Sequence, residues 1–432
     1  MKISRNIAFI SLFVLIAALA AATIIEKFFG TETALSAIYH SWWFIALWGV
    51  CAIAGIYYLI IYNLHNKIVN RKFLNCKFII HLSLIIILAG AFTSFLTSKR
   101  GFVHIRQGEI LNYFLIQDEG GETARENLPF DVKLLMFSKT PLTPALRSVP
   151  FDKGDNARNE RRGLKGDFFS YLQIDGKTCC VYLNHIYKYK GYRFYQYEYD
   201  SDERGVTLLV NRDPAGIAIT YAGYLLLLVS ALWLLWKKKL TIKGKHAGLP
   251  LLPIIAIPTA AVWFFISQIK PMTPVLRSPM LAAHVSVIMV SYVLLLIIAV
   301  LSAIALIKEK RTKSKEKRQR QLLPEKQQVA ENFQFSILNS QLLFPAVFLL
   351  AIGIFIGAVW ANISWGRYWG WDSKETWALI TLLVYAVPFH KKTFPKFQDP
   401  KFFHRYLLIA FLTVLMTFLG VSFLLGGMHS YL

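Results

Sequence analysis

The sequence predicts an α-helical membrane protein with about nine transmembrane helices and one small β-rich extracytoplasmic domain. Three observations support this fold class. The chain of 432 residues is 55% hydrophobic, and a soluble protein this apolar would expose large sticky patches. Apolar windows of about 20 residues, the length that crosses ~30 Å of hydrocarbon, recur along the chain. One long stretch, residues 98–214, has strand-like patterns instead.

The expected membrane spans are apolar segments separated mostly by short polar ones. They lie near 6–24, 43–62, 77–97, 215–236, 250–268, 282–307, 342–361, 375–391 and 406–425. The first span has no clear small-residue cleavage site and is closely followed by others. We therefore expect it to remain as a helix and not to act as a secretion signal.

The orientation of the chain follows from its basic segments. Lys/Arg-rich stretches lie on alternate sides of consecutive spans, and the positive-inside rule places them in the cytoplasm. They occupy residues 67–77, 237–245, 308–320 and 390–405. The run at 308–320 also suits nucleic acid or anionic lipid, but a cytoplasmic connector is favoured and no nucleic-acid module accompanies it. We therefore expect membrane lipid as a partner and no nucleic acid.

Residues 98–214 have the signals of a small β domain, with Tyr-, Phe- and Val-rich runs between Gly-containing turns. The expected strands are 104–116, 168–175, 178–189, 192–200 and 206–212, and 140–167 is expected to be a loop. This segment shows no nucleophile–base set and no phosphate loop. Cys179 and Cys180 are adjacent and would form only a strained disulfide, so we expect them to be packing residues.

A compact aromatic block, WGRYWGWDSKETW, occupies residues 365–377. Interfacial aromatic belts are scattered along membrane proteins, whereas this block has glycines and charges at fixed places among its tryptophans. A plain belt and a flat aromatic platform for a ligand both remain open at this point. The tryptophans are Trp365, Trp369, Trp371 and Trp377, and the interspersed residues are Gly366, Gly370, Asp372, Lys374 and Glu375.

Four of the ten histidines lie in or beside expected spans. His81 and His390 are near the cytoplasmic ends of their spans, while His284 and His429 are near the outer ends. A histidine at such depth is costly and usually pairs with something inside the bundle. Each alone is most simply a structural hydrogen-bonding residue, but together they form one inner and one outer pair. His404, by contrast, lies in a basic loop and is expected to be solvated or locally bonded.

Paired histidines among apolar helices suit an iron porphyrin, whose axial positions accept imidazole nitrogens. The porphyrin also needs an aromatic, apolar slot, which the tryptophan block can supply. In this interpretation Asp372, Lys374 and Glu375 orient the propionates or tune the ring, and Gly366 and Gly370 allow close approach.

The block WGRYWGWDSKETW closely resembles the tryptophan-rich WWD signature of haem-handling proteins in cytochrome c maturation. HVSVIMVSY and GVSFLLGGMHSY resemble the elements that flank this signature in the System II (Ccs) branch. YHSWWF, HLSLIIILAGAF, RQGE, LPFDVKLL and KGYRFYQYEYD resemble the other component of that system, the ResB/CcsB type. The chain thus resembles a fused CcsB–CcsA (ResB–ResC-type) cytochrome c synthase. Ser373 stands where the family usually has proline, and Ser422 where it usually has asparagine.

The resemblance implies four regions: CcsB/ResB-like helices (1–97), the extracytoplasmic β domain (98–214), a closing CcsB/ResB-like helix with a cytoplasmic loop (215–245), and a CcsA-like haem-handling domain (246–432). It also implies axial ligation of haem b iron by His81 and His390 on the inner side and by His284 and His429 at the outer site. The outer site further includes Asp372, Glu375 and the tryptophan block, with His284, His429 and Asp372 as the residues nearest the chemistry.

The activity implied is that of a holocytochrome c synthase of the lyase type in the bacterial cytoplasmic membrane. It would move haem outward and attach it to the Cys-x-x-Cys-His motif of apocytochrome c, whose cysteines a separate thiol reductant keeps reduced. Three alternatives remain: a haem exporter that presents haem to a separate ligase, an electron-transfer cytochrome b, and a membrane scaffold with aromatic anchors. The cytochrome b alternative leaves the tryptophan block unexplained.

Overall fold

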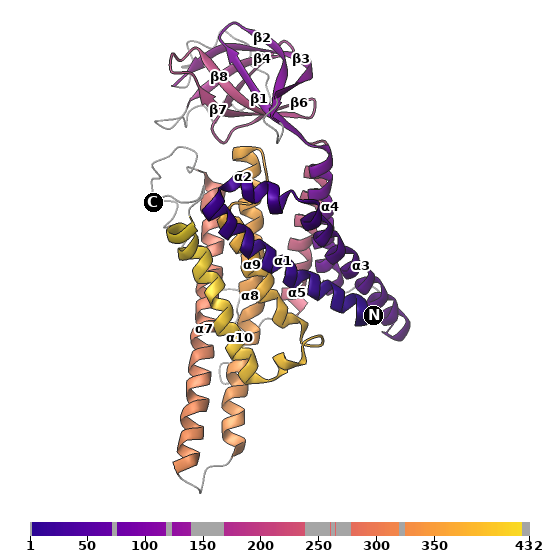
Figure 1. Cartoon of the computed structure of the whole chain (residues 1–432), viewed down its shortest axis with the longest axis vertical. Helices are drawn as coiled ribbons and strands as arrows, with labels where there is room; N and C mark the ends of the chain where they lie inside the picture. Colours follow the sequence, from indigo (N-terminus) through magenta and orange to yellow (C-terminus); the bar gives the residue numbers. More distant parts are fainter. Residues whose placement is uncertain are drawn as a thin grey trace.

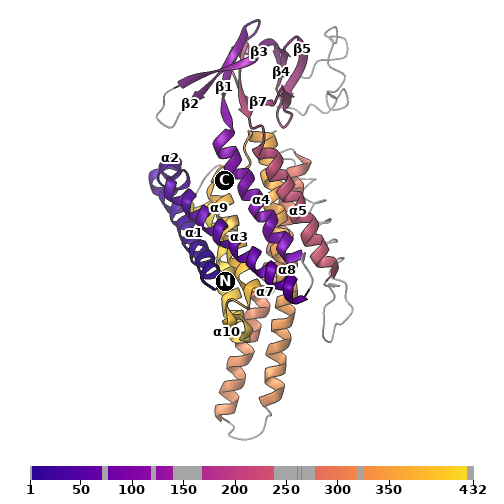
Figure 2. The same cartoon turned by 90° about the vertical axis from the view of Figure 1, so that its right-hand side faces the viewer.

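A computed structural model describes residues 2–70, 76–117, 123–139, 168–237, 278–318 and 325–425, together with the single residues 260 and 264. Long helices form an elongated bundle, and a β domain stands at one end of it (Figures 1 and 2). A helical hairpin projects from the opposite end in both views. The β domain and the tip of this hairpin therefore lie at opposite ends of the molecule.

The helices that flank the β domain in sequence form the N-terminal part of the bundle. α4 and α5 lead into and out of the β domain and pack closely against each other. A Cβ at Gly90 would lie 2.3 Å from Thr220 Oγ1, so this close crossing requires a glycine there. The elements are α1 (Lys2–Phe29), α2 (Thr31–Ala34), the π-helical turn η1 (Leu35–Tyr39), α3 (Trp42–Asn70), α4 (Cys76–Thr97) and α5 (Gly216–Lys237).

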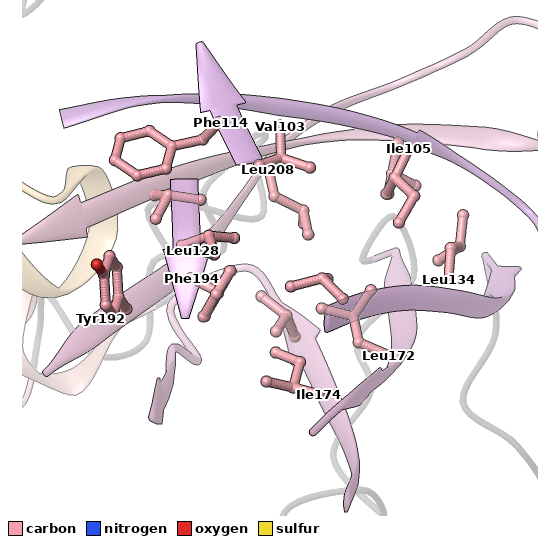
Figure 3. Packing of buried hydrophobic residues seen from close by; sticks show 14 of the residues in the cluster. Val103, Ile105, Phe114, Leu128, Leu134, Leu172, Ile174, Tyr192, Phe194 and Leu208 are labelled. Carbon is pink, nitrogen blue, oxygen red and sulfur yellow. The ribbon is translucent and has the colours of Figure 1, made fainter. Parts of the chain in front are cut away.

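The β domain is one eight-stranded antiparallel sheet with the order β5-β4-β3-β2-β1-β8-β7-β6. The sheet curls so that β5 contacts β6 and β7, and its inner face encloses the core shown in Figure 3. The strands are β1 (Lys99–Arg106), β2 (Ile110–Gln117), β3 (Thr123–Ser138), β4 (Phe169–Ile174), β5 (Lys177–Tyr182), β6 (Tyr187–Tyr189), β7 (Tyr192–Tyr199) and β8 (Gly205–Arg212).

The C-terminal part of the bundle is built on two very long helices. α7 has 40 residues and α8 has 41, so each extends about 60 Å, twice the thickness of the hydrocarbon layer. Their far ends form the projecting hairpin, and the segment expected to be a connector (308–335) is helical at 308–318 and 325–335. The elements are α7 (Pro279–Arg318), α8 (Glu325–Trp365), α9 (Ser373–Ala386), the 3₁₀ turns η5 (Val387–His390) and η6 (Pro395–Gln398), α10 (Pro400–Leu415) and the π-helical η7 (Met416–Leu425).

Seven of the described helices are long and apolar enough to cross a membrane, whereas the sequence predicts about nine spans. The expected span at 375–391 corresponds to α9, whose 14 residues extend only about 21 Å. Its helix gives way to η5 at Val387, directly before Pro388, which is poorly tolerated inside an α-helix. The expected span at 250–268 lies almost entirely outside the described residues.

The strand predictions are right only in part. The expected strands 168–175, 192–200 and 206–212 correspond to β4, β7 and β8, whereas the run expected as one strand at 178–189 is divided between β5 and β6 by a turn at 183–184. The expected loop at 140–167 lies outside the described residues. The run expected as one strand at 104–116 is divided between β1 and β2 by a turn at Gly108, whose φ is +86°. β3 is missing from the prediction, although its exposure alternates along the strand from Leu128 to Leu134. Cys179 and Cys180 form no disulfide and are buried on opposite faces of β5, in two different hydrophobic clusters, which confirms that they are packing residues.

The expectation for His404 is wrong. Its side chain is 1% exposed on α10, and its ring nitrogens lie 3.0 Å from Ser336 Oγ and 3.2 Å from Asn339 Nδ2. These contacts tie α10 to α8, and Ser302 of α7 completes the group at 3.3 Å. A buried polar group of this kind is stable only when it is hydrogen-bonded, and here three helices supply the partners.

Candidate functional site

The tryptophan block forms a short loop between α8 and α9. Two of its residues have left-handed backbone conformations, Gly366 with φ +70° and Trp371 with φ +55°. Asp372 is the N-cap of α9, where its buried carboxylate accepts a hydrogen bond of 2.8 Å from the Lys374 backbone N–H. Glu375 Oε2 accepts a 2.8 Å bond from the Gly370 N–H. Two carboxylates of the block therefore hold its loop in this conformation by bonding backbone N–H groups.

The β domain contacts the beginning of this loop. Asn211 Nδ2 donates to Gly366 O at 2.6 Å, and an Arg100 guanidinium nitrogen donates to Trp365 O at 3.2 Å. A Cβ at Gly366 would lie 3.0 Å from Leu209 Cδ2 and 3.2 Å from Tyr195 Cε2. Gly366 thus permits the close approach of the β domain.

The four tryptophans do not form one continuous stack. Trp365 packs edge-on against Trp360 of α8, with ring centroids 4.8 Å apart, and Trp369 packs edge-on against Trp371 at 5.9 Å. Trp377 points toward α1, where its indole N–H donates to Thr23 Oγ1 at 3.1 Å. All four side chains are half-buried. The tryptophan rings therefore lie at angles to one another, and they contact different helices.

Positive charge at the junction comes from arginines that the sequence analysis did not select. Part of the Arg100 side chain is accessible to solvent, but its surroundings are crowded, and burial lowers its pKa to about 10, with the nearby charge of Arg367 as the next cause. The guanidinium of Arg100 therefore remains charged at neutral pH. Burial also raises the pKa of Tyr368, so its phenol stays neutral.

Two polar groups of the loop are buried without a hydrogen-bond partner in the described structure, Tyr368 OH and Trp369 Nε1. A buried donor left unpaired costs about 1–3 kcal/mol, so a ligand or water that contacted these two groups would stabilise the loop.

The structure brings the expected inner pair of histidines together. His81 of α4 and His390 of η5 have ring centroids 6.0 Å apart, with the rings nearly perpendicular at 81°. His390 Nδ1 lies 3.2 Å from Ala386 O, and Phe9 of α1 packs against the His390 ring at 5.1 Å. Three distant parts of the chain thus meet at this pair.

His284 lies between α7 and α8, five residues after the first residue of α7. Its Nδ1 is 2.6 Å from Gly353 O, and its ring covers Gly357, where a Cβ would lie 2.6 Å from His284 Cε1. Two glycines four residues apart therefore form a shallow seat for the imidazole. Gly357 is eight residues before Trp365, or about 12 Å along α8.

His429 lies outside the described residues, so the expected outer pair is represented by His284 alone. The preceding η7 reaches the tryptophan block, because Lys374 Nζ donates to Ser422 Oγ at 3.3 Å. Ser422 is seven positions before His429 in the sequence.

Two histidines contact a backbone carbonyl oxygen through Nδ1. A carbonyl oxygen only accepts, so the Nδ1 atoms of His284 and His390 must carry the proton. A hydrogen bond from one ring nitrogen to a carbonyl oxygen also orients metal-binding histidines. His81 and His390, whose ring centroids are 6.0 Å apart, would hold the iron of a haem through their imidazole nitrogens. The residues present fit haem.

Comparison with known proteins identifies two family regions in the chain. The profile described as "Cytochrome C assembly protein" matches residues 218–429, and that described as "ResB-like family" matches residues 75–233. The tryptophan block, His284, His390 and His429 lie in the first region. His81 and the β domain lie in the second.

Relatives support the first assignment. The chain is 35% identical over 216 residues to the cytochrome c biogenesis protein CcsA of Guillardia theta, covering 48% of this chain and 71% of that protein. It is 37% identical over 166 residues to CcsA of Chlamydomonas reinhardtii, covering 38% and 44% of the two chains. It is 40% identical over 169 residues to Protein NrfI of Wolinella succinogenes, covering 38% of this chain but only 17% of NrfI.

The tryptophan block and the four selected histidines all lie within the matched residues. The protein is a multi-pass membrane protein of the CcsA-type cytochrome c biogenesis family, with a ResB-like region fused ahead of the CcsA-like one.

Proposed function

We propose that this protein is a holocytochrome c synthase that carries haem b from an inner to an outer site and attaches it to apocytochrome c. The observation that carries the proposal is the approach of His81 and His390 to 6.0 Å. His81 comes from the ResB-like region and His390 from the CcsA-like region, so the pair exists only where the two regions pack together. We assign the inner iron ligands to these two residues.

The outer site in this proposal is the tryptophan block with His284 and His429 as iron ligands. Support comes from the Nδ1 hydrogen bond of His284, which orients its ring as in metal-binding histidines, and from the contact of η7 with Lys374. Trp365, Trp369, Trp371 and Trp377 would contact the porphyrin through faces and edges. Gly366, Asp372 and Glu375 would act by holding the loop in shape, since each is engaged in it.

The arginines at the junction suit the two propionate carboxylates of haem. Arg367 lies within the loop and Arg100 beside it, and both supply positive charge, whereas Asp372 and Glu375 are anionic and bonded within the loop. A guanidinium is the side chain best adapted to a carboxylate. We therefore assign propionate binding to the arginines.

The chemistry is the addition of two cysteine thiols to the two vinyl groups of haem. Each S–H adds across a C=C bond, forming one C–S and one C–H bond, so atoms and electrons balance without an oxidant. The substrate brings its own nucleophiles, and the task of the protein is to hold the vinyl groups in reach of the thiols. The thiols must arrive reduced, which implies a separate thiol reductant.

The orientation belongs to the same proposal. In this proposal the projecting α7–α8 hairpin lies in the cytoplasm of a bacterium, and the β domain and tryptophan block face outward. The basic residues after Lys308 support this orientation. An outward-facing site is the place where an exported apocytochrome c meets haem.

The first test is the visible spectrum of the purified full-length protein. We expect bound haem in the wild type and loss of most of it in His81→Ala and His390→Ala, with partial recovery when imidazole is added. His104→Ala is the matched control, because His104 is half-exposed on the β domain and pairs with Asp200 at 3.0 Å. Wild-type protein without haem, or histidine variants that keep it fully, would refute the proposal.

A second test separates the synthase from a haem exporter. The protein is expressed with one apocytochrome c in a host that lacks other maturation factors, and the product is examined for haem that survives denaturation. Covalent haem supports the synthase. Only loosely bound or free haem would instead favour export to a separate ligase.

A further inference from the structure

We propose that Tyr39 is a positioning residue of the outer haem site, because it fixes the indole of Trp371 and leaves only one face of that ring for haem. This inference rests on the proposed function and adds a residue to it. Tyr39 ends η1, in a segment before residue 75 that lies outside both family matches.

The first observation is the stacking of the two rings. Tyr39 and Trp371 are nearly parallel at 14°, with centroids 4.6 Å apart. Phe44 packs edge-on against both, at 5.6 Å from Trp371 and 5.9 Å from Tyr39. Tyr39 is 3% exposed and Phe44 is 1% exposed. One face of Trp371 is thus covered, so a porphyrin can meet only the other face or the ring edge.

The second observation concerns the Tyr39 hydroxyl. It lies 3.3 Å from Thr376 Oγ1, and the Thr376 backbone N–H donates to Asp372 O at 2.9 Å in the first turn of α9. A single side chain therefore contacts the residue before the N-cap of α9 and a residue one turn into that helix. This links the loop to the helix that follows it.

The third observation is the backbone of Trp371. A φ of +55° is uncommon for a bulky residue and costs about 1–3 kcal/mol unless the surroundings hold it. The Tyr39 ring supplies such a contact on the indole. Strain that is kept at a ligand site and held by neighbours is typical of a preorganised site.

α1 extends the same contact along α9. Ser373 Oγ donates to Glu26 Oε2 at 2.7 Å, and Trp377 Nε1 donates to Thr23 Oγ1 at 3.1 Å. About one turn after Trp377, Ile380 packs in the same hydrophobic cluster as residues of α1. Positions 373, 377 and 380 lie on one face of α9, so α1 packs along the first half of this helix and fixes its position.

The test uses full-length protein carrying His390→Ala, so that haemin added from solution reports the outer site. Tyr39→Met fills similar space without a flat ring, and Tyr39→Phe keeps the ring without the hydroxyl. Trp42→Met is the matched control, because Trp42 is an aromatic residue three positions on and is 81% exposed. Haemin affinity, the Soret maximum and the reduction potential are measured for each.

We expect Tyr39→Met to weaken haemin binding by about tenfold, the scale of one lost aromatic contact, and to shift the reduction potential. Tyr39→Phe should recover the affinity to within about threefold, and Trp42→Met should match the background protein. If Tyr39→Met does not fold, Tyr39→Leu takes its place with the same interpretation.

Two results would overturn the inference while leaving the proposed function intact: unchanged affinity and potential in Tyr39→Met, or equal losses in Tyr39→Met and Tyr39→Phe. A background protein with no affinity for haemin that depends on His284 would instead refute the outer site itself. The two failures are therefore distinguishable.

Discussion

Gly357→Ala is a direct test of the seat that holds His284. A Cβ at this position would lie 2.6 Å from His284 Cε1 and 2.7 Å from Nδ1. Carbon atoms in contact are at least about 3.4 Å apart, so the imidazole has to retreat by about 0.8 Å. The Nδ1 bond to Gly353 O, now 2.6 Å, then lengthens by up to the same amount, to at most about 3.4 Å, and is strongly weakened.

The magnitude follows from these distances. A hydrogen bond of this kind contributes about 1 kcal/mol, and losing the partner that orients a metal-binding histidine lowers metal affinity by about 10–100-fold. We therefore expect Gly357→Ala to weaken haemin binding at the outer site by about one to two orders of magnitude. Folding should be little affected, because alanine is the better helix former by about 1 kcal/mol.

The assay is a haemin titration of purified protein carrying His390→Ala, followed at the Soret band. Gly55→Ala is the matched control, because Gly55 also lies inside a helix but has nothing within 4 Å of its Cβ position. An outer site that binds haemin equally well in Gly357→Ala and in the Gly55→Ala control would refute the reasoning.

Three further predictions concern stability. Asp372→Ala should lower the free energy of unfolding by about 1 kcal/mol in the haem-free protein, measured by thermal denaturation, while Asp372→Asn keeps the cap; an asparagine variant as unstable as the alanine variant contradicts the capping role. Gly366→Ala should cost about 1–2 kcal/mol from its left-handed backbone plus the clash at Leu209, and should speed proteolysis between the β domain and the helices. Gly108→Ala, with φ +86° and open space around it, shows the backbone cost alone, so equal effects argue against the clash. His404→Ala should destabilise the bundle by about 1–3 kcal/mol by leaving Asn339 with a lost partner, whereas the surface variant His104→Ala should not.

The helical architecture was predictable because hydrocarbon thickness imposes a length on each span, and seven apolar segments meet it. The proximity of His81 and His390 was also foreseeable, since histidines buried at one depth tend to pair. Their distance was not, because it depends on how helices from two halves of the chain pack together.

Other features required the tertiary structure. His404 lies among Lys and Arg in the sequence, yet it is buried by α7 and α8. One local signal was available: Asp399 followed by Pro400 is a typical helix start, and α10 begins there. β3 was missed because Pro129 and several charges obscure its alternating pattern.

The partners of the tryptophan block could not be identified as such from the sequence. Arg100, Asn211 and Tyr39 reach it from far away in the chain. Tyr39 belongs to the motif YHSWWF, but nothing in the sequence pairs it with Trp371. Only the folded structure makes them neighbours.

The β domain contacts Trp365 and Gly366 through their carbonyl oxygens, which every amino acid possesses. These two hydrogen bonds do not depend on which side chain residue 365 carries, only on the path of the main chain. Replacing the Trp365 indole by another ring would therefore change its packing against Trp360 without removing either bond to the β domain.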